Sequence, residues 1–207
     1  MKLPRFYPIL DSGLLARRGI GVLDAADAFL SSGVEILQFR HKGLVTRQTL
    51  SDLEAVAQLC QAARVKLVVN DRADLAGMFG AALHLGQDDL PPAAARRVVG
   101  LETTIGFSTH NEAQLRAARE EPVDYLALGP LFGTSSKEDP DPVVGVREFK
   151  RLRQFTDRPL VAIGGITRSN AHEALESGAD SVAIIGDLIP EDASICARMR
   201  EWVSLLG

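Results

Sequence analysis

Eight short apolar runs alternate with amphipathic helical stretches along the chain, and this alternation constrains the fold more than any other feature. Two strands joined through a helix normally lie parallel, with the helix as the crossover between them. Strands are expected at 6–11, 35–40, 66–71, 82–86, 103–109, 124–130, 159–164 and 181–186, and helices at 22–32, 46–64, 72–79, 91–98, 111–120, 146–155, 169–177 and 192–205.

Eight strand–helix units are the number that closes a parallel sheet into a barrel. The sequence therefore predicts an α/β fold, a single-domain (β/α)8 TIM barrel formed by residues 1–207. The alternative is an open, doubly wound sheet, which would need a long crossover connection or a reversal of strand order. The sequence favours the barrel without excluding the open sheet.

Composition narrows the classes of function. The 207 residues are 46% hydrophobic, enough for one sizeable core, and the net charge of -4 supplies no broad basic field for nucleic acid. No apolar run approaches the ~18 residues that span a membrane, and the N-terminus lacks the apolar region of a signal peptide. Cys60 and Cys196 lie far apart without metal-like spacing. These features predict a cytoplasmic enzyme with no nucleic-acid or membrane partner.

Polar or glycine clusters follow seven of the eight expected strands. The clusters are 38–42 (QFRHK), 70–72 (NDR), 86–89 (GQDD), 108–110 (STH), 129–137 (GPLFGTSSK), 164–166 (GGI) and 185–187 (IGD). Because a parallel barrel gathers the carboxyl ends of its strands on one face, these clusters should converge on one pocket. This convergence predicts an enzyme rather than a scaffold.

The cluster after the second expected strand is cationic. Alternation along a strand points Gln38, Arg40 and Lys42 toward the barrel mouth. An arginine fork together with a lysine charge suits a pyrophosphate group. The alternative is a solvated, inert strand end, but Ile36 lies on the same face, and an apolar-to-cationic switch at the mouth favours a functional site.

Carboxylates follow the third and fourth expected strands. Asn70 and Asp71 end one strand, and Asp88 and Asp89 follow the next. Neighbouring carboxylates suit Mg²⁺, which usually takes one or two protein carboxylates and completes its shell with water and substrate phosphates. Either acid alone could equally be a helix cap.

Ser108 and His110 follow the fifth expected strand. No orienting acid accompanies them, so a hydrolytic triad is disfavoured. The better interpretation is a hydroxyl donor to substrate, with His110 either a structural cap or a proton carrier.

The last three clusters indicate a second anionic subsite. In the 129–137 loop, Thr134, Ser135 and Ser136 supply hydroxyls and Lys137 supplies a charge. The glycines at 164–165 and 186 end the seventh and eighth strands, where barrels of this kind often bind phosphate through backbone N–H groups.

Six motifs, in order and across essentially the whole chain, resemble the thiamine-phosphate synthase family. They are QFRHK, NDRADLA, HLGQDD, GFSTH, GPLFGTSSK and VAIGGI. The resemblance implies a transferase that moves a pyrimidinylmethyl group. Such an enzyme condenses 4-amino-2-methyl-5-hydroxymethylpyrimidine diphosphate with thiazole phosphate, giving thiamine monophosphate and pyrophosphate with Mg²⁺ as cofactor.

The resemblance also implies roles for individual residues. Pyrimidine diphosphate would contact Gln38, Arg40, Lys42, Asn70, Ser108 and Lys137, of which Arg40, Lys42, Ser108 and Lys137 would be catalytic. Mg²⁺ would bind Asp71 and Asp89, and the thiazole phosphate would contact Thr134, Ser135, Ser136, Gly165, Ile185 and Gly186. The chain departs from the family pattern at Leu10, Ser136 and Gly186, which replace two threonines and a serine.

Three alternatives share this architecture. A thiazole tautomerase of the same fold would use His110 as proton carrier, but such enzymes typically lack the QFRHK cations and the metal aspartates. A sugar-phosphate isomerase or epimerase would explain the glycines but not the paired aspartates. A non-catalytic binding protein would not need charged groups at so many strand ends. The expected partners are small-molecule substrates, and the sequence is compatible with a homo-oligomer.

Overall fold

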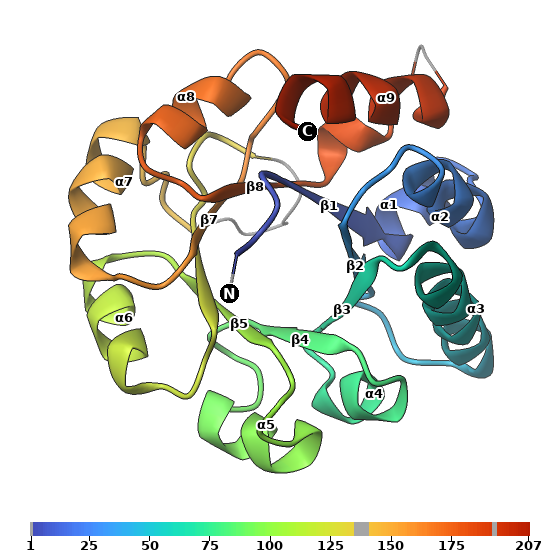
Figure 1. Cartoon of the computed structure of the whole chain (residues 1–207), viewed down its shortest axis with the longest axis horizontal. Coiled ribbons are helices and arrows are strands. Elements are labelled where there is room, and N and C mark those ends of the chain that lie inside the picture. The colour runs from blue at the N-terminus through green and yellow to red at the C-terminus, as the bar shows by residue number, and fades with distance from the viewer. Residues whose placement is uncertain (1, 135–140, 192–193) are drawn as a thin grey trace.

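The protein is an eight-stranded parallel barrel ringed by helices, as seen in a computed structural model that describes residues 2–134, 141–191 and 194–207 (Figure 1). The strands are β1 (Phe6–Asp11), β2 (Ile36–Arg40), β3 (Lys66–Asn70), β4 (Ala82–Leu85), β5 (Ile105–Thr109), β6 (Tyr125–Leu128), β7 (Leu160–Ile163) and β8 (Ser181–Ile184). β1 pairs with β2 on one side and β8 on the other, so the sheet closes. The predicted barrel is confirmed and the open sheet is wrong.

The crossover helices lie near the expected positions. They are α2 (Val22–Leu30), α3 (Arg47–Ala63), α4 (Ala73–Met78), α5 (Pro92–Val99), α6 (Glu112–Ala117), α7 (Val146–Leu152), α8 (Ala171–Glu176) and α9 (Ile195–Leu206). The last turn of two expected helices is a separate 3₁₀ turn: η1 (Ala118–Glu120) follows α6, and η2 (Arg153–Phe155) follows α7. Across the described residues, no helix is long and apolar enough to cross a membrane.

Two helical turns were not expected from the sequence. α1 (Ser12–Arg17) begins directly after β1, where the Asp11 side chain accepts a hydrogen bond from the Leu14 N–H and caps the turn. η3 (Gly186–Leu188) follows β8 almost as directly. Both are too short to show helical periodicity, which is why the pattern of apolar residues did not reveal them.

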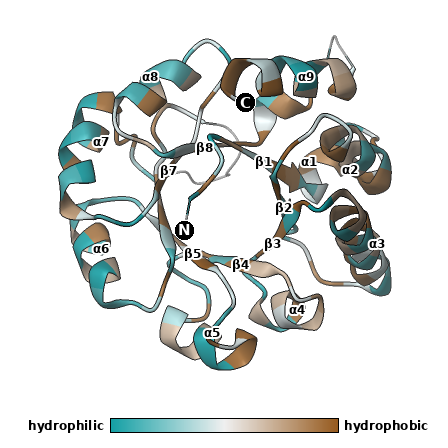
Figure 2. Cartoon of the chain, in the orientation of Figure 1, coloured by the Kyte–Doolittle hydropathy of each residue, from teal (hydrophilic) through white to brown (hydrophobic). Residues whose placement is uncertain are grey.

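The alternation of side chains along the strands divides the core into two parts. Outward-facing strand residues pack against the helices. The ribbon in Figure 2 shows hydrophobic residues along the strands and hydrophobic stretches alternating with hydrophilic ones along the helices. Inward-facing residues fill the barrel: Leu3, Tyr7, Ile9, Ile36, Val68, Ala82, Tyr125, Ala127, Val161 and Ala183. Two of these are tyrosines, so the floor beneath the barrel mouth contains polar groups as well as apolar ones.

The interior has room for the Tyr125 ring because the neighbouring strand supplies a glycine. A Cβ atom at Gly106 would lie 2.0 Å from Tyr125 Cζ, well inside van der Waals contact. Tyr125 is fully buried, so its ring cannot swing outward into solvent. The absence of a side chain at 106 is therefore a packing requirement of the barrel interior.

Gly106→Ala should overpack this layer and lower the free energy of unfolding by about 1–3 kcal/mol, measured by urea denaturation. The matched control is Gly77→Ala in α4, where the nearest atom to an added Cβ is 3.8 Å away. That control should be neutral or stabilising by up to about 1 kcal/mol because alanine favours a helix. Equal stability of the Gly106 variant and wild type would contradict this account of the interior.

Candidate active site

The carboxyl ends of the strands surround one cavity of about 1380 Å³. Its lining includes every described residue of the expected site: Gln38, Arg40, Lys42, Asn70, Asp71, Asp89, Ser108, Thr134, Gly165, Ile185 and Gly186. Ser135, Ser136 and Lys137, also expected there, lie outside the described residues. Residues up to 148 positions apart in the chain thus share one pocket.

Arg40 is held at the end of β2 by a buried carboxylate. Its Nη1 forms an ion pair with Asp11 Oδ2, and the Arg40 and Asp11 side chains are only 15% and 7% exposed. Asp11 also caps α1, so one carboxylate fixes both the guanidinium and the first turn after β1. Sequence reasoning missed Asp11 because its main partner is 29 residues away and lies on the neighbouring strand.

Lys42 and two carboxylates form the next part of the rim. Lys42 Nζ lies 2.6 Å from Asp71 Oδ2, and Asp89 accepts a hydrogen bond from the Gly86 N–H at 2.6 Å. The pKa of the Asp71 carboxyl is raised to about 6, first by burial and then by its hydrogen bond with Asp89, while Lys42 opposes the rise. Two adjacent, partly buried carboxylates of this kind are stabilised by a cation.

The floor of the cavity carries polar groups that the sequence motifs do not reveal. Tyr7 Oη, Tyr125 Oη and His84 form a buried hydrogen-bonded series, which ends at Ser108. The one available signal was strand alternation, because Tyr7 and His84 occupy inward positions within otherwise apolar runs.

His110 faces the cavity but is tied to the loop after β6. Its Nδ1 lies 2.6 Å from the Gly129 carbonyl oxygen and 3.5 Å from Asp141 Oδ2. Because a carbonyl only accepts, Nδ1 carries the proton and donates it to Gly129. The structural interpretation of His110 is thus supported by a contact, and a role as proton carrier stays a prediction.

On the opposite side of the mouth, two glycines let the β6 loop rest directly on the end of β7. Gly164 and Gly165 have φ of 94° and 64°, a region that favours glycine. A Cβ at Gly164 would lie 2.5 Å from Pro130, and one at Gly165 would lie 2.3 Å from the Gly133 carbonyl oxygen. The loop backbone therefore lies directly against this edge, where the N–H groups of Leu131 and Phe132 donate to the carbonyl oxygens of Ile163 and Gly164.

Gly186 opens η3, and the residue after it is anchored to the last helix. Asp187 Oδ2 accepts hydrogen bonds from Trp202 Nε1 at 2.9 Å and from Arg168 Nε at 3.1 Å. Arg198 Nη1 donates to the Asp187 carbonyl oxygen at 2.7 Å. Asp187 thus holds the backbone of η3 in place beneath Gly186, a role that its sequence position did not reveal.

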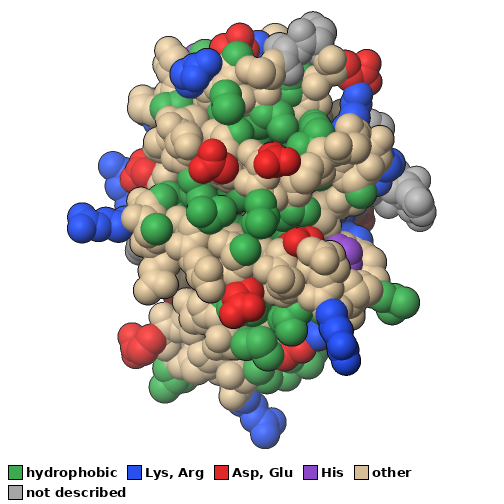
Figure 3. All heavy atoms as spheres, turned by 90° about the vertical axis from the view of Figure 1, so that its right-hand side faces the viewer, with side chains coloured by type: hydrophobic (Ala, Val, Ile, Leu, Met, Phe, Trp, Pro, Cys, Tyr) green, Lys and Arg blue, Asp and Glu red, His purple; other side chains and the backbone are tan. Residues whose placement is uncertain are grey.

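Charge at the surface is mixed. Figure 3 shows the face around α2 and α3, where acidic and basic side chains are scattered among hydrophobic ones. The net charge of -4 over the whole chain gives no general attraction for an anion, and among the described residues Arg17, Arg40 and Lys42 bring positive charge to the lining of the cavity.

Comparison with known proteins decides the family. A family model described as thiamine monophosphate synthase matches residues 6–188, the span from β1 to η3. The chain belongs to this family. Two curated relatives, both named thiamine-phosphate synthase, come from Koribacter versatilis and Chloroflexus aurantiacus. They are 46% and 36% identical, covering 100% and 98% of this chain and 97% and 93% of their own.

A solved structure of thiamine phosphate pyrophosphorylase from Pyrococcus furiosus has the same architecture. It superposes with a TM-score of 0.84 at 26% identity, over 98% of this chain and 95% of that one. The prediction of a thiamine-phosphate synthase, a transferase of thiamine biosynthesis, is confirmed, and neither the tautomerase nor the isomerase alternative is favoured.

For a member of the thiamine monophosphate synthase family, the Asp11–Arg40 pair gives a direct test of the site. Asp11→Asn keeps an oxygen to cap α1 but removes the carboxylate from Arg40, which leaves a buried guanidinium charge without its partner. Unfolding free energy should fall by about 1–3 kcal/mol in urea denaturation.

The matched control is Asp74→Asn, which breaks the exposed Arg72–Asp74 pair. An exposed pair of this kind contributes little, so stability should change by no more than about 0.5–1 kcal/mol. Equal losses in the two variants would show that burial of the Asp11–Arg40 pair has no energetic consequence.

Proposed function

We propose that the protein joins 4-amino-2-methyl-5-hydroxymethylpyrimidine diphosphate to thiazole phosphate in one cavity, forming thiamine monophosphate and releasing pyrophosphate. The observation that carries the proposal is that two different binding edges face each other across the mouth of the barrel. A cationic pair beside two carboxylates lies on the β2–β4 side, and a glycine-lined edge lies on the β6–β8 side. We propose one catalytic domain of residues 1–207 that acts in the cytoplasm, alone or as a homo-oligomer.

The diphosphate belongs at the cationic edge. Arg40 offers a planar fork and Lys42 a point charge, both suited to phosphate oxygens. Asn70 is 8% exposed, and its Nδ2 has no hydrogen-bond partner among the described residues. A buried donor without a partner is costly, so a ligand acceptor at this position would stabilise the site. Gln38, Ser108 and Lys137 would complete the contacts.

Asp71 and Asp89 fit a magnesium ion. Their carboxyls are close enough for each to influence the other, as the raised pKa of Asp71 records. Because Mg²⁺ usually takes one or two protein carboxylates and completes its shell with water and phosphate oxygens, these two carboxylates would suffice as its protein ligands. When bound, the ion would neutralise charge on the leaving diphosphate.

The reaction needs no protein nucleophile. The electron-rich aminopyrimidine ring can bear positive charge at its methylene carbon, so the carbon–oxygen bond breaks as the diphosphate leaves with the electron pair. The lone pair of the thiazole nitrogen then forms the new carbon–nitrogen bond. Arg40 and Lys42 stabilise the charge that develops on the leaving group, while the barrel holds the two reacting atoms together.

The thiazole phosphate belongs at the glycine-lined edge. Thr134, Gly165, Ile185 and Gly186 line this part of the cavity, and Ser135 and Ser136 would extend it. Gly186 supplies no side-chain donor, so its backbone N–H would make the contact. The anchoring of Asp187 to Trp202 keeps that backbone fixed.

Pyrophosphate release tests the proposal. Purified protein is incubated with both substrates, with each substrate alone, and with or without Mg²⁺. Release should require both substrates and the metal. Asp71→Asn and Asp89→Asn should each reduce kcat/KM by a factor of about 100 or more, since charge stabilisation is usually the largest contribution to catalysis.

Asp88→Asn is the matched control for the metal assignment, because Asp88 is the exposed neighbour of Asp89 in the same loop. It should keep activity close to that of wild type. Release from a single substrate, or full activity of both metal variants, would overturn the proposed chemistry.

The raised pKa of Asp71 predicts pH-dependent metal binding. Below its pKa of about 6 the carboxyl takes up a proton, which must leave before Mg²⁺ can bind. The apparent Kd should therefore approach a rise of about tenfold per pH unit below pH 6 and level off above it. Calorimetric titration of Mg²⁺ from about pH 8 to about pH 5 measures this, and a flat profile would contradict it.

A further inference from the structure

Five polar side chains form a continuous hydrogen-bonded series across the floor of the cavity. Gln38 Nε2 lies 3.0 Å from Tyr7 Oη, which lies 2.8 Å from Tyr125 Oη. Tyr125 Oη lies 3.0 Å from His84 Nδ1, and His84 Nε2 lies 2.9 Å from Ser108 Oγ. The series runs from β2 through β1, β6 and β4 to β5, so it links opposite sides of the barrel beneath the mouth.

The direction of this series follows from counting protons. An amide nitrogen only donates, so Gln38 gives a proton to the Tyr7 oxygen. Among the described residues, Tyr125 Oη is the acceptor that lies within reach of the buried Tyr7 proton, so Tyr7 donates to Tyr125. Tyr125 then has one proton to donate, and His84 Nδ1 is the acceptor within reach. An imidazole that accepts at Nδ1 carries its proton on Nε2, from which it donates to Ser108.

This order of donors and acceptors requires a neutral His84 and protonated Tyr7 and Tyr125, and burial favours these states. Burial lowers the pKa of His84 to about 4, an effect that the nearby Asp89 opposes and Lys42 reinforces, so the ring is neutral near pH 7. Burial raises the pKa of Tyr7 to about 12 and that of Tyr125 well above its ordinary value. Both phenols therefore keep their protons.

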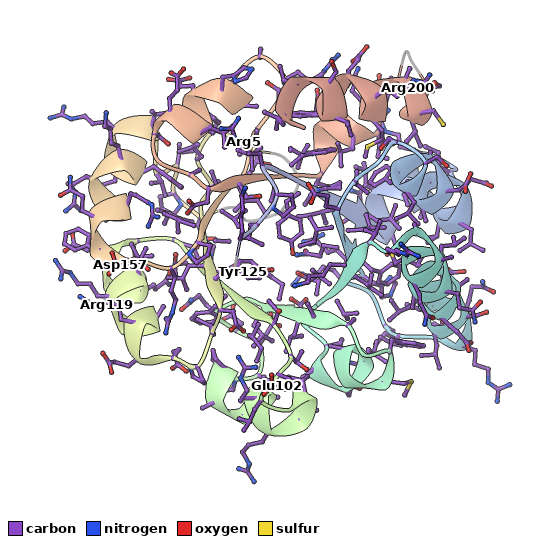
Figure 4. All side chains as sticks on the ribbon, in the orientation of Figure 1. Arg5, Glu102, Arg119, Tyr125, Asp157 and Arg200 are labelled. Carbon is purple, nitrogen blue, oxygen red and sulfur yellow. The ribbon has the colours of Figure 1, made fainter. Side chains whose placement is uncertain are left out.

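Packing keeps the groups in place. Tyr125 points into the ring of strands (Figure 4), where the missing side chain at Gly106 makes room for it. Its ring centroid lies 5.5 Å from that of His84 and 6.2 Å from that of Tyr7. Tyr7 and Tyr125 are at most 1% exposed, so water does not compete for their hydroxyls.

We infer that Tyr125 is a positioning residue that holds His84 in the Nε2–H tautomer and so leaves the Ser108 hydroxyl hydrogen free to point into the cavity. His84 is the one side chain recorded within hydrogen-bonding distance of Ser108 Oγ among the described residues. Since His84 donates to Ser108, the serine hydroxyl is the acceptor in this hydrogen bond and does not donate its proton to the histidine. Its O–H is available to an acceptor on the bound substrate.

The tautomer decides whether Ser108 attracts or repels an anionic ligand. With the proton on Nδ1, the histidine would accept the Ser108 proton, and the serine would present lone pairs to the cavity. Those lone pairs would repel the oxygens of a diphosphate. With the proton on Nε2, the same serine donates to them. This consequence rests on the proposed function, whereas the tautomer itself does not.

The tautomer is measurable by NMR on full-length protein with ¹⁵N-labelled histidine rings and no substrate. The four histidines are separated by comparison with a His84→Gln variant. The wild-type protein should show His84 as a single neutral tautomer with its proton on Nε2. A proton on Nδ1, or on both nitrogens near pH 7, would overturn the inference.

Two matched variants test the part played by Tyr125. Tyr125→Phe and Tyr7→Phe each remove one buried hydroxyl from the same interior layer. Tyr125→Phe removes the donor to Nδ1, so the two tautomers should mix. Tyr7→Phe leaves that donor in place and should keep the single tautomer. An unchanged tautomer in Tyr125→Phe, or an equal change in both variants, would contradict the inference, and thermal melts verify that each variant is folded.

Kinetics then separates positioning from a general structural role. Tyr125→Phe should lower kcat/KM for the pyrimidine diphosphate by about tenfold or more, the effect of losing a hydrogen bond to a charged group. In a Ser108→Ala background the same change should add almost nothing, because Tyr125 acts through Ser108. Additive losses would refute this. A protein that shows the expected tautomer but releases no pyrophosphate would instead refute the proposed function.

Discussion

Closure of the sheet is the constraint on which the rest of the molecule depends. The pairing of β1 with both β2 and β8 places the end of every strand on a single rim, so side chains distant in sequence line one cavity. The same closure creates a narrow interior that must be filled, and here it is filled by apolar side chains together with two tyrosines and a histidine. Closure of the sheet thus brings the binding groups together at the rim and places the polar floor beneath them.

Electrostatic pairing organises the rim. Arg40 and Lys42 are each held by a carboxylate, Asp11 and Asp71 respectively, so the ion pairs define the positions of both cations. The Asp11 pair is largely buried and also caps α1, whereas Lys42 is about half exposed. The first cation is therefore a fixed part of the barrel wall, and the second can exchange partners.

Sequence reasoning reached the barrel, the strand positions and the rim residues because these depend on local patterns. The periodicity of apolar residues predicts the strands and helices, and polar residues at the ends of apolar runs predict which residues lie at the rim. Asp11, His84, Tyr125 and Asp187 were missed because their roles depend on partners on other elements, between 11 and 41 residues away in the contacts that define them. α1 and η3 were missed because each is too short to show a period. Which carboxylate faces which cation is a property of the closed sheet, not of any one segment.

The anchoring of Asp187 has a consequence for the end of the chain. α9 is the last helix, and through Trp202 and Arg198 it fixes the residue that follows Gly186 at the cavity. The C-terminal helix thus positions residues at the ligand pocket in addition to packing against the barrel. A fusion partner or a truncation that disturbs this helix would therefore displace residues at the rim of the cavity. A change before β1 would not, because β1 begins at the end of the barrel opposite the cavity.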